Sequence, residues 1–480
     1  MKILFKKSLV LSLMMILGVI LTGCKDDNTG TSTTTTTTDT TVDCDATPDA
    51  EGCEETFDLG GVTVKILHGA PYEVDPFHED FSGQNQNEKQ QLQRAVEARY
   101  NVEIKYLNYP DNAGYGPDRV NAIINGVVAG DPIGHILMID SKWIGQLAEA
   151  EAISDVTDYD REYAHQFLHD SMRTFGSYKN NLYGFSTGVI TAETGLYFNM
   201  DLLNTIGKES PAEKWNNGEW TWTDFNNYVT DVQAALGSLG DDYYAMGGVP
   251  GYWAQNMVPA NGGYLVNPDT KKVTFTQSKS LNTFSYLNSL WTSGVWEPEP
   301  DYDAGSASFA LGKVLIHPGD LWYVNAPHRW GNLNFDLGFV PYPIGDNVAL
   351  EDYKVGVEST ALYAISGGYE KADNPDRLND EMLFRIWNDL QAWEDPQDAF
   401  LDFETLLETR YNDLESIEAH MSITDKVYFE QLFNLGISGT DADYGFYPIA
   451  NSAVKEGNVR SELEAVLPVY QEKLKEIFGE

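Results

Sequence analysis

The sequence predicts an α/β protein of two domains, and three observations support this prediction. Strand-like and helix-like segments alternate after residue 57, which is typical of βαβ units with a mostly parallel sheet. About 420 residues follow that point, more than one hydrophobic core usually holds. No segment in this part has the apolar length of a membrane-spanning helix.

Three stretches establish the alternation. GGVTVKILHG (60–69) predicts a strand, and residues 87–107 predict a helix that runs into a second strand. Residues 119–140 repeat this order as a helix, a Gly-Asp-Pro turn and an apolar strand. Ligands of such sheets bind in the crevice beyond the carboxyl ends of the strands.

The N-terminus has the features of an export signal. Lys2, Lys6 and Lys7 precede an apolar stretch of roughly 14 residues, too short to span a bilayer comfortably. The ending Leu-Thr-Gly-Cys resembles the bacterial lipobox. We therefore expect residues 1–23 to be removed and the new N-terminal Cys24 to carry lipid, which would anchor the protein lastingly. The alternative is an uncleaved N-terminal anchor.

A Thr-rich stretch separates this cysteine from the rest of the chain. Residues 24–56 contain almost nothing apolar to bury, which predicts a disordered tether with a reach of about 30 Å. Cys44 and Cys53 bracket DATPDAEG within it. In an exported protein they either form a small disulfide loop or stay reduced. A metal site is disfavoured, because no histidine lies near them.

The charge of the exported chain is strongly negative. Removal of the signal leaves 28 Lys and Arg against 73 Asp and Glu, a formal charge of about −45. Nucleic acids and anionic lipid surfaces are therefore excluded as partners, since both require clustered cations. The acidic surface favours solubility and does not identify the ligand.

Seven segments in order resemble one protein family over about 300 residues. They are VEARYNVEIKY, VVAGDPIGHILMIDSKWIGQLAEAEAISDVTDY, LYGFSTGVITAETGLYFNMDLLNTIG, EWTWTDFNNYV, FALGKVLIHPGDLW, FDLGFVPYPIGD and VGVESTALYAISGG. The chain is similar to the extracellular solute-binding proteins of ABC importers, in particular those that capture sugars and oligosaccharides. In EWTWTDFNNYV, Thr221 or Thr223 is the expected helix cap and Trp222 has a structural role.

The resemblance implies a periplasmic-binding-protein-like fold: two α/β lobes joined by a multi-strand hinge, with the ligand cleft between them. Lobe 1 would comprise residues 57–190 and about 340–395, and lobe 2 residues 191–339 and about 396–480. The chain would cross between lobes near Phe185–Gly195, near Phe339–Pro343 and again after about residue 395. The C-terminal helices would pack across the lobes.

The resemblance also implies the function. The protein would be a monomeric receptor on the outer face of the bacterial cytoplasmic membrane, without cofactor or enzymatic activity. It would close around a sugar and deliver it to the permease subunits of an ABC transporter. Two alternatives are a secreted carbohydrate-active enzyme and a receptor of the same fold that serves sensing.

Sugar chemistry narrows the candidate ligand-binding residues. Carboxylates and amides bind hydroxyl groups, and aromatic rings cover the apolar C–H face of a sugar. Loops that follow strands and combine these types are HGAPYE, DSKW, YWAQNMVPANGG, PGDLW and VEST. We expect the ligand-binding residues to be Tyr72, Glu73, Asp140, Trp143, Trp253, Asn256, Asp320, Trp322 and Glu358.

Structural roles compete with ligand binding at several of these positions. In a chain with 11 tryptophans, each candidate tryptophan could instead belong to the core. The family's commonest form places Trp two residues after Gly, whereas Trp322 follows Gly319 by three. Tyr72 and Glu73 could be surface residues, and His68 is expected to form hydrogen bonds within its loop.

Catalytic and metal-binding motifs are missing. GSASFALGKV (305–314) has the wrong glycine spacing for a phosphate loop, and Val314 replaces the Ser or Thr that would bind magnesium. There is no His-Glu-x-x-His, no Gly-x-Ser-x-Gly and no cysteine after Cys53. WEPEPDYD (296–303) lacks the spacing of an EF-hand, so we expect a solvated loop. The sequence leaves open whether two carboxylates are spaced for glycoside hydrolysis.

Overall fold

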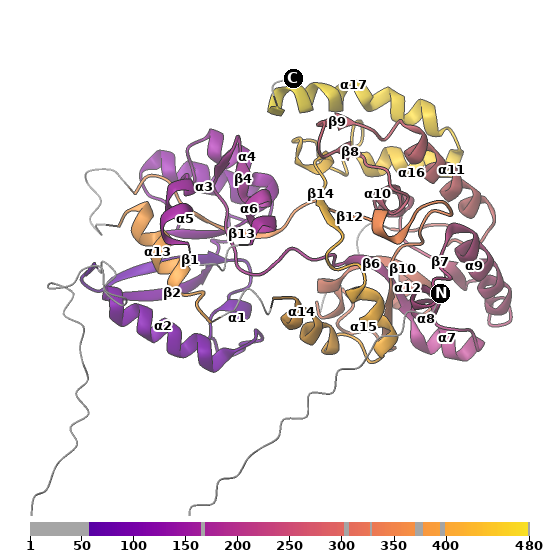
Figure 1. Cartoon of the computed structure of the whole chain (residues 1–480), viewed down its shortest axis with the longest axis horizontal. Coiled ribbons are helices and arrows are strands. Elements are labelled where there is room, and N and C mark those ends of the chain that lie inside the picture. The colour runs from indigo at the N-terminus through magenta and orange to yellow at the C-terminus, as the bar shows by residue number, and fades with distance from the viewer. Residues whose placement is uncertain are drawn as a thin grey trace, which may run out of the picture. The chain divides into compact units, whose positions relative to one another are not determined.

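The computed structural model of the chain describes residues 57–164, 169–301, 307–326, 329–369, 378–393 and 399–478 (Figure 1). The predicted signal peptide and tether, with Cys24, Cys44 and Cys53, lie outside the described residues. Within the described ranges the strands form two four-stranded sheets and three two-stranded ones. Helices pack against both of the larger sheets.

The first sheet has the strand order β13-β3-β1-β2. Its strands are β1 (Val62–His68), β2 (Val102–Asn108), β3 (Ile136–Asp140) and β13 (Ala361–Ile365). β1 pairs in parallel with both β2 and β3, whereas β13 is antiparallel to β3. The βαβ alternation predicted from residues 60–140 is therefore confirmed.

Two helices link the parallel strands, α2 (Gln86–Tyr100) and α3 (Pro117–Ala129). Pro117 suits the first turn of α3 because its fixed φ is helical and its missing N–H is not needed there. Gly130 ends α3 with a φ of 74°, in the left-handed region that glycine adopts without strain. The predicted Gly-Asp-Pro turn thus begins with the residue that closes the helix.

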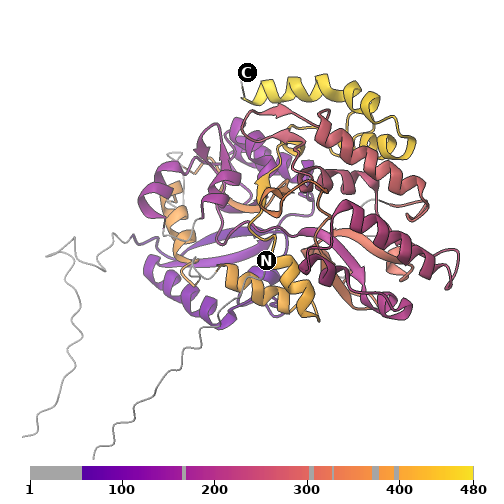
Figure 2. The ribbon, with the colours of Figure 1, turned by 45° about the vertical axis from the view of Figure 1, so that its right-hand side comes forward.

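Both faces of the first sheet are buried. Ile66 of β1 packs into a cluster with α2 and α13 (Asp380–Asp389), whereas Leu67 packs into a separate cluster with α3. α13 comes from far along the chain, yet it lies beside these N-terminal elements in both views (orange in Figures 1 and 2). A sheet covered on both sides explains the continuous apolar run ILMID of β3.

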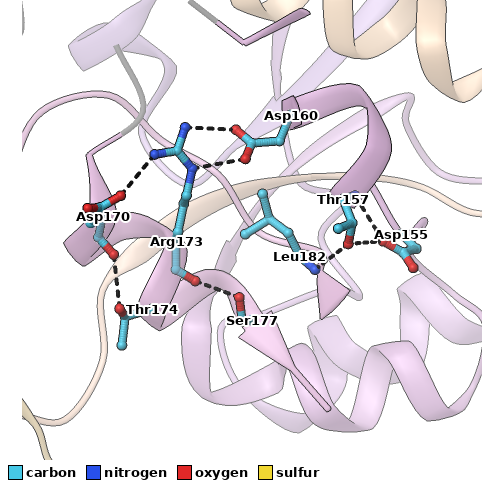
Figure 3. A network of polar contacts seen from close by, with 8 residues as sticks. All are labelled: Asp155, Thr157, Asp160, Asp170, Arg173, Thr174, Ser177 and Leu182. Carbon is cyan, nitrogen blue, oxygen red and sulfur yellow. Dashed lines mark hydrogen bonds and ion pairs between the residues drawn. The ribbon is translucent and has the colours of Figure 1, made fainter. Parts of the chain in front are cut away.

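An ionic network stabilises the helices that follow β3. The guanidinium of Arg173 in α6 (Asp170–Gly176) donates to both carboxylate oxygens of Asp160, at 2.9 and 3.2 Å, and to Asp170 at 3.1 Å (Figure 3). Nearby, Thr157 Oγ1 accepts a hydrogen bond from the Leu182 amide at 2.8 Å. The bidentate geometry makes the Arg173 pair stronger than a usual surface ion pair. These contacts connect α5 (Thr157–Tyr163), α6 and the short strand β5 (Asn181–Leu182).

The second sheet has the order β11-β6-β10-β7 and is mixed, not mostly parallel. Its strands are β6 (Thr194–Asn199), β7 (Tyr244–Met246), β10 (Val314–Asp320) and β11 (Leu337–Val340). β6 lies between β11 and β10 and is antiparallel to both, whereas β10 and β7 are parallel. The βαβ pattern of the first sheet therefore does not apply to β6, the first strand of this sheet along the chain.

Helix ends of the second region agree with the sequence. Gly207, with a φ of 63°, closes α7 (Met200–Ile206) as the family pattern predicts. α9 (Trp222–Leu236) begins with a capping box between Thr221 and Asp224, so Thr221 is the cap. Trp222 has the structural role that we expected, because its ring stacks on Tyr286 at 4.5 Å between centroids.

The remaining helices of this region pack around the second sheet. They are α8 (Pro211–Asn216), α10 (Pro250–Ala260), α11 (Ser278–Thr292), α14 (Ala399–Glu408), α15 (Leu414–Met421), α16 (Phe446–Glu456) and α17 (Val459–Phe478). The C-terminal helices α16 and α17 thus join the core of the second sheet, instead of packing across the lobes as predicted. None of the described helices combines the length and apolarity needed to cross a bilayer.

The chain passes between the sheets at three places. The Phe185 amide still donates to Tyr363 O of the first sheet at 2.8 Å, and β6 of the second sheet begins at Thr194. The return occurs between β12 (Val355–Val357) and the start of β13, because Tyr342 and Val355 still pack in the second core. This passage lies later in the chain than the predicted Phe339–Pro343. The third follows α13, before α14. β12 itself pairs in parallel with β14 (Val427–Phe429).

Candidate functional site

Asp140 is the last residue of β3, and its carboxylate makes four polar contacts. The side chain is buried, and it accepts hydrogen bonds from the Lys142 amide at 3.0 Å and from Ser359 Oγ at 3.3 Å. Lys142 Nζ forms an ion pair with Oδ2 at 3.2 Å, and the hydroxyl of Tyr115 donates to the same oxygen. Asp140 is thus a fixed anionic acceptor at the carboxyl edge of the first sheet.

An aromatic pair lies beside this carboxylate. The rings of Tyr115 and Trp143 are 4.9 Å apart between centroids, and Trp143 is buried while Tyr115 is 64% exposed. Burial and the charge of Asp140 raise the pKa of Tyr115, so its hydroxyl stays protonated and donates. The exposed aromatic surface at this edge therefore belongs to Tyr115, with Trp143 behind it.

Glu358 follows β12 and has an unusual protonation equilibrium. Burial raises its pKa to about 7, Lys142 opposes that shift, and the charges of Asp320 and Asp140 add to it. Its Oε1 lies 3.5 Å from Nε2 of Gln255. A carboxyl group with this pKa can donate or accept a hydrogen bond at neutral pH.

The second sheet contributes Asp320, the last residue of β10. The hydroxyl of Thr194 donates to Asp320 Oδ1. The charge of Asp320 also acts on the carboxyls of Glu193 and Glu358 and on the hydroxyl of Tyr447. Asp320 is therefore close to groups that Asp140 and Lys142 also influence, although it belongs to the other sheet.

Trp322 is the exposed aromatic residue of this second edge. It lies in the 3-10 turn η2 (Leu321–Val324), is 50% exposed, and meets the buried Tyr323 edge to face at 4.5 Å. The guanidinium of Arg329 lies 5.6 Å from the ring centroid. Half of the surface of Trp322 is thus exposed, as its assignment to the site requires.

The segment YWAQNMVPANGG is not a loop but the helix α10, which starts with Pro250 at a position that favours helix initiation. Trp253 has no exposed surface. Its Nε1 donates to Gly247 O at 2.8 Å and its ring packs against Trp296 and Tyr342. A side chain held on all sides by the core offers no face to a ligand, so the structure gives Trp253 a packing role.

Asn256 and Gln255 of α10 are buried but polar. Asn256 Nδ2 donates to Tyr252 O at 3.0 Å, while its Oδ1 has no hydrogen-bond partner among the described residues. Gln255 Oε1 accepts from the hydroxyl of Tyr447 at 2.7 Å. Gln255 thereby joins Tyr447 to Glu358 and links α16, α10 and the β12 end.

Tyr72 and Glu73 lie in the short helix α1 (Pro71–Val74), and both are exposed. Their environment differs from that of Asp140, because the charge that acts on Glu73 is Arg410. His68 Nδ1 accepts a hydrogen bond from the Ala70 amide at 3.0 Å, and burial lowers its pKa to about 4. His68 is thus the neutral loop residue that we expected.

The structure therefore brings together Asp140, Asp320 and Glu358 from the predicted set, with Trp143 and Trp322 nearby on the same two loops. Tyr115 was missed, because only the loops after the first and third strands of the first sheet were searched for aromatic residues. Tyr115 is the last residue of NYPDNAGY, at the end of β2, and this segment also combines aromatic residues with Asp and Asn.

Other features of the described residues bear on chemistry. No three His, Cys, Asp or Glu side chains in the described ranges are grouped to hold a metal ion. A cavity of about 180 Å³ lies beside α2, and a depression of about 560 Å³ lies between α11 and α17. Both are lined by residues outside the predicted set.

Comparison with known proteins identifies related chains. Residues 83–369 match the bacterial extracellular solute-binding protein family. A maltose-binding periplasmic protein MalE from Listeria monocytogenes in complex with maltose has a TM-score of 0.59 at 14% identity, over 86% of this chain and 98% of that one. A cyclic alpha-maltosyl-1,6-maltose binding protein from Arthrobacter globiformis has a TM-score of 0.57 at 17% identity, over 87% and 100%.

A third solved structure is similar to the same extent. UgpB from Mycobacterium tuberculosis in complex with glycerophosphocholine has a TM-score of 0.55 at 14% identity, over 87% of this chain and 98% of that one. The shared fold is the mixed α/β, two-lobed fold of periplasmic binding proteins, as the sequence predicted. The family that matches is one of solute-binding proteins.

Proposed function

Because the chain belongs to the family of bacterial extracellular solute-binding proteins, we propose that its ligand is a sugar or oligosaccharide, held by the loops after β3, β10 and β12. The observation that carries this proposal is the pairing of a carboxylate with an exposed aromatic ring at the ends of strands in both sheets. Asp140 lies beside Tyr115, and Asp320 lies two residues before Trp322.

These side chains suit a sugar. Asp140 and Asp320 accept hydrogen bonds from hydroxyl groups, and Glu358 can accept or donate because its pKa is about 7. Tyr115 and Trp322 have exposed ring faces for the apolar C–H side of a sugar. Of the three structures described above, one contains maltose, and another is of a cyclic alpha-maltosyl-1,6-maltose binding protein. The third contains glycerophosphocholine, so the fold by itself does not select a sugar.

The mechanism that we propose is a shift between open and closed lobes. In this proposal one lobe comprises residues 57–190 and the segment from β13 through α13, and the other comprises the segment from β6 through β12 and the chain from α14 onward. A ligand that touches Asp140 on one sheet and Trp322 on the other binds the closed state more tightly. That difference in affinity, and not binding alone, drives closure.

The closed complex would deliver its sugar to an ABC permease, with ATP hydrolysed by separate subunits. Lipid on Cys24 and a flexible stretch to residue 56 would keep the protein at the outer face of the membrane. In a Cys24→Ser variant the folded protein should leave the membrane fraction. Retention of this variant on membranes after a carbonate wash would contradict lipidation.

A thermal-shift screen of the full chain tests the ligand class. A ligand at 100 times its dissociation constant adds about 2.7 kcal/mol to the unfolding free energy, so a bound sugar should raise the melting temperature by several degrees. The panel should contain monosaccharides, maltose-type oligosaccharides and, as a matched non-sugar, glycerophosphocholine. Stabilisation by the non-sugar alone would overturn the assignment of a carbohydrate ligand.

A further inference from the structure

The cavity of about 180 Å³ beside α2 is lined by polar groups that other parts of the protein do not use. It lies on one face of the first sheet, where Tyr106 of β2 and Tyr363 of β13 contribute side chains. Gln93 of α2 and the neighbours Ser186 and Thr187 complete its polar lining. None of these residues belongs to the site at Asp140 and Asp320.

Gln93 is a buried side chain of this cavity whose hydrogen bonds are incomplete. It is only 5% exposed, and its Nε2 makes long hydrogen bonds to Glu97 Oε1 at 3.3 Å and Ile104 O at 3.5 Å. Its Oε1 is buried and has no partner among the described residues. An unpaired buried acceptor is unfavourable, so an O–H or N–H donor inside the cavity would stabilise this side chain.

The hydroxyl groups carry the second argument. Those of Tyr106, Tyr363, Ser186 and Thr187 form no hydrogen bond with another residue of the described part of the chain. The two phenols are also close enough for the charge of one to affect the pKa of the other. Four hydroxyls and an amide oxygen thus converge on a small volume, each able to accept a hydrogen bond, and the hydroxyls able to donate one.

The walls of the cavity determine which kind of ligand would suit it. Trp393, Leu390 and Pro76 supply aromatic and aliphatic surface, and Lys89 Nζ lies 4.0 Å from the centroid of the Trp393 ring. None of the described residues that line it is an aspartate or glutamate, in contrast to the carboxylates around Asp140. A neutral molecule with hydroxyls and C–H faces would match these walls.

We propose that this cavity is a second binding site, for a small neutral polyol no larger than a single sugar ring. Its volume is below the roughly 300 Å³ at which sites for drug-sized ligands begin, so an oligosaccharide does not fit inside. At about 30 Å³ per water it would otherwise hold about six water molecules. A polyol that replaces them makes the same hydrogen bonds and buries its C–H groups against the walls.

The test uses the full chain labelled with 5-fluorotryptophan and followed by fluorine NMR during titration with glycerol and with D-glucose. The resonance of Trp393 reports this cavity, and that of Trp322 reports the proposed sugar site. Trp393→Phe and Trp322→Phe assign the two signals. Separate reporters keep a failure of this inference distinguishable from a failure of the proposed function.

We expect at least one polyol to shift the Trp393 signal saturably. Tyr106→Phe with Tyr363→Phe removes only the two hydroxyls and should weaken that binding at least tenfold. Thr187→Val, a smaller change for the case that the double variant folds poorly, should weaken it severalfold. Tyr178→Phe is the matched control, because its hydroxyl binds Glu149 on the surface, and it should bind as the wild type does. A Trp393 signal that never saturates, or equal affinity in all variants, would mean that the cavity holds only water.

Discussion

The loops after β3 and β10 have similar sequences, Asp-Ser-Lys-Trp and Asp-Leu-Trp, but they present their tryptophans to opposite environments. Both continue directly into a 3-10 turn, η1 (Ser141–Trp143) and η2. Trp143 is 7% exposed, whereas Trp322 is 50% exposed. The same residue type therefore packs into the core in one loop and faces outward in the other.

The spacing from the aspartate accounts for this difference. A 3-10 turn has three residues per turn, so moving a side chain by one position rotates it by about 120°. Trp143 is the third residue after Asp140, and the third residue after Asp320 is Tyr323, which is also buried. Trp322 corresponds to Lys142, whose side chain reaches solvent. The position, and not the residue type, determines which ring is exposed.

The largest effect should come from the two buried rings. Trp143→Ala should lower the unfolding free energy by about 3–5 kcal/mol, because it removes a packed aromatic side chain and leaves a cavity. Tyr323→Ala should have an effect of similar size, whereas Trp322→Ala should cost less than about 1 kcal/mol. Urea denaturation of the three variants measures this. Equal costs for Trp143→Ala and Trp322→Ala would refute the rotation argument.

The second-largest effect should be the difference in stability between Asp140→Ala and Asp320→Ala. Asp140→Ala leaves Lys142 and Tyr115 without their acceptor and should cost about 3 kcal/mol, the low end for a broken buried ion pair, since Lys142 reaches water. Asp320→Ala removes the acceptor of the Thr194 hydroxyl but also relieves repulsion with Glu358, so it should cost less than Asp140→Ala. Denaturation midpoints compare the two. A larger loss of stability from Asp320→Ala than from Asp140→Ala would contradict this prediction.

The exposed ring should matter for ligand and not for folding. Trp322→Ala should weaken sugar binding by about 2 kcal/mol, roughly 30-fold, as expected for an aromatic anchor of an interface. Trp322→Phe keeps a ring and should recover part of this loss. Calorimetric titration of both variants with a sugar found in the thermal screen gives the values. Unchanged affinity in Trp322→Ala would remove this residue from the site.

The smallest effect concerns Glu358, whose pKa is influenced by both Asp140 and Asp320. The pKa of Glu358 is about 7 in the folded protein and about 4.3 in an unfolded chain, so the folded state binds the proton more tightly. The contribution of Glu358 to the unfolding free energy should therefore rise by about 1 kcal/mol as the pH falls from 8 to 6. Glu358→Gln should reduce this rise, and the buried Glu430, whose pKa is also about 7, should account for a further part. An identical pH profile for Glu358→Gln would contradict the raised pKa.

The sequence predicted local features well where a single short segment determines them. The Thr221 cap, the Gly207 end of α7 and the parallel pairing of β1 with β2 depend on neighbouring residues or one βαβ unit. α10 was mistaken for a loop, since its Asn, Gln and Gly residues suggested one, although Pro250 starts a helix and the core buries most of its residues.

Site residues were harder to predict because their exposure depends on distant partners. Trp253 and Trp322 both follow a Pro-Gly pair in the sequence, but the packing of Trp296 and Tyr342 decides that Trp253 is core. Tyr115 becomes part of the site only through Asp140, which is 25 residues away. No pattern of adjacent residues contains that information.

The central claim is that one ligand contacts both sheets at once, through Tyr115 beside Asp140 and through Trp322 after β10. A double-mutant cycle with Tyr115→Ala and Trp322→Ala, measured by calorimetric titration with the tightest-binding sugar, tests it most directly. We expect each single variant to weaken binding at least tenfold, with a 1:1 stoichiometry in the wild type and in both variants. The double variant should show no measurable binding. If either single variant binds the sugar with wild-type affinity, the ligand is held by one loop alone and the account is wrong.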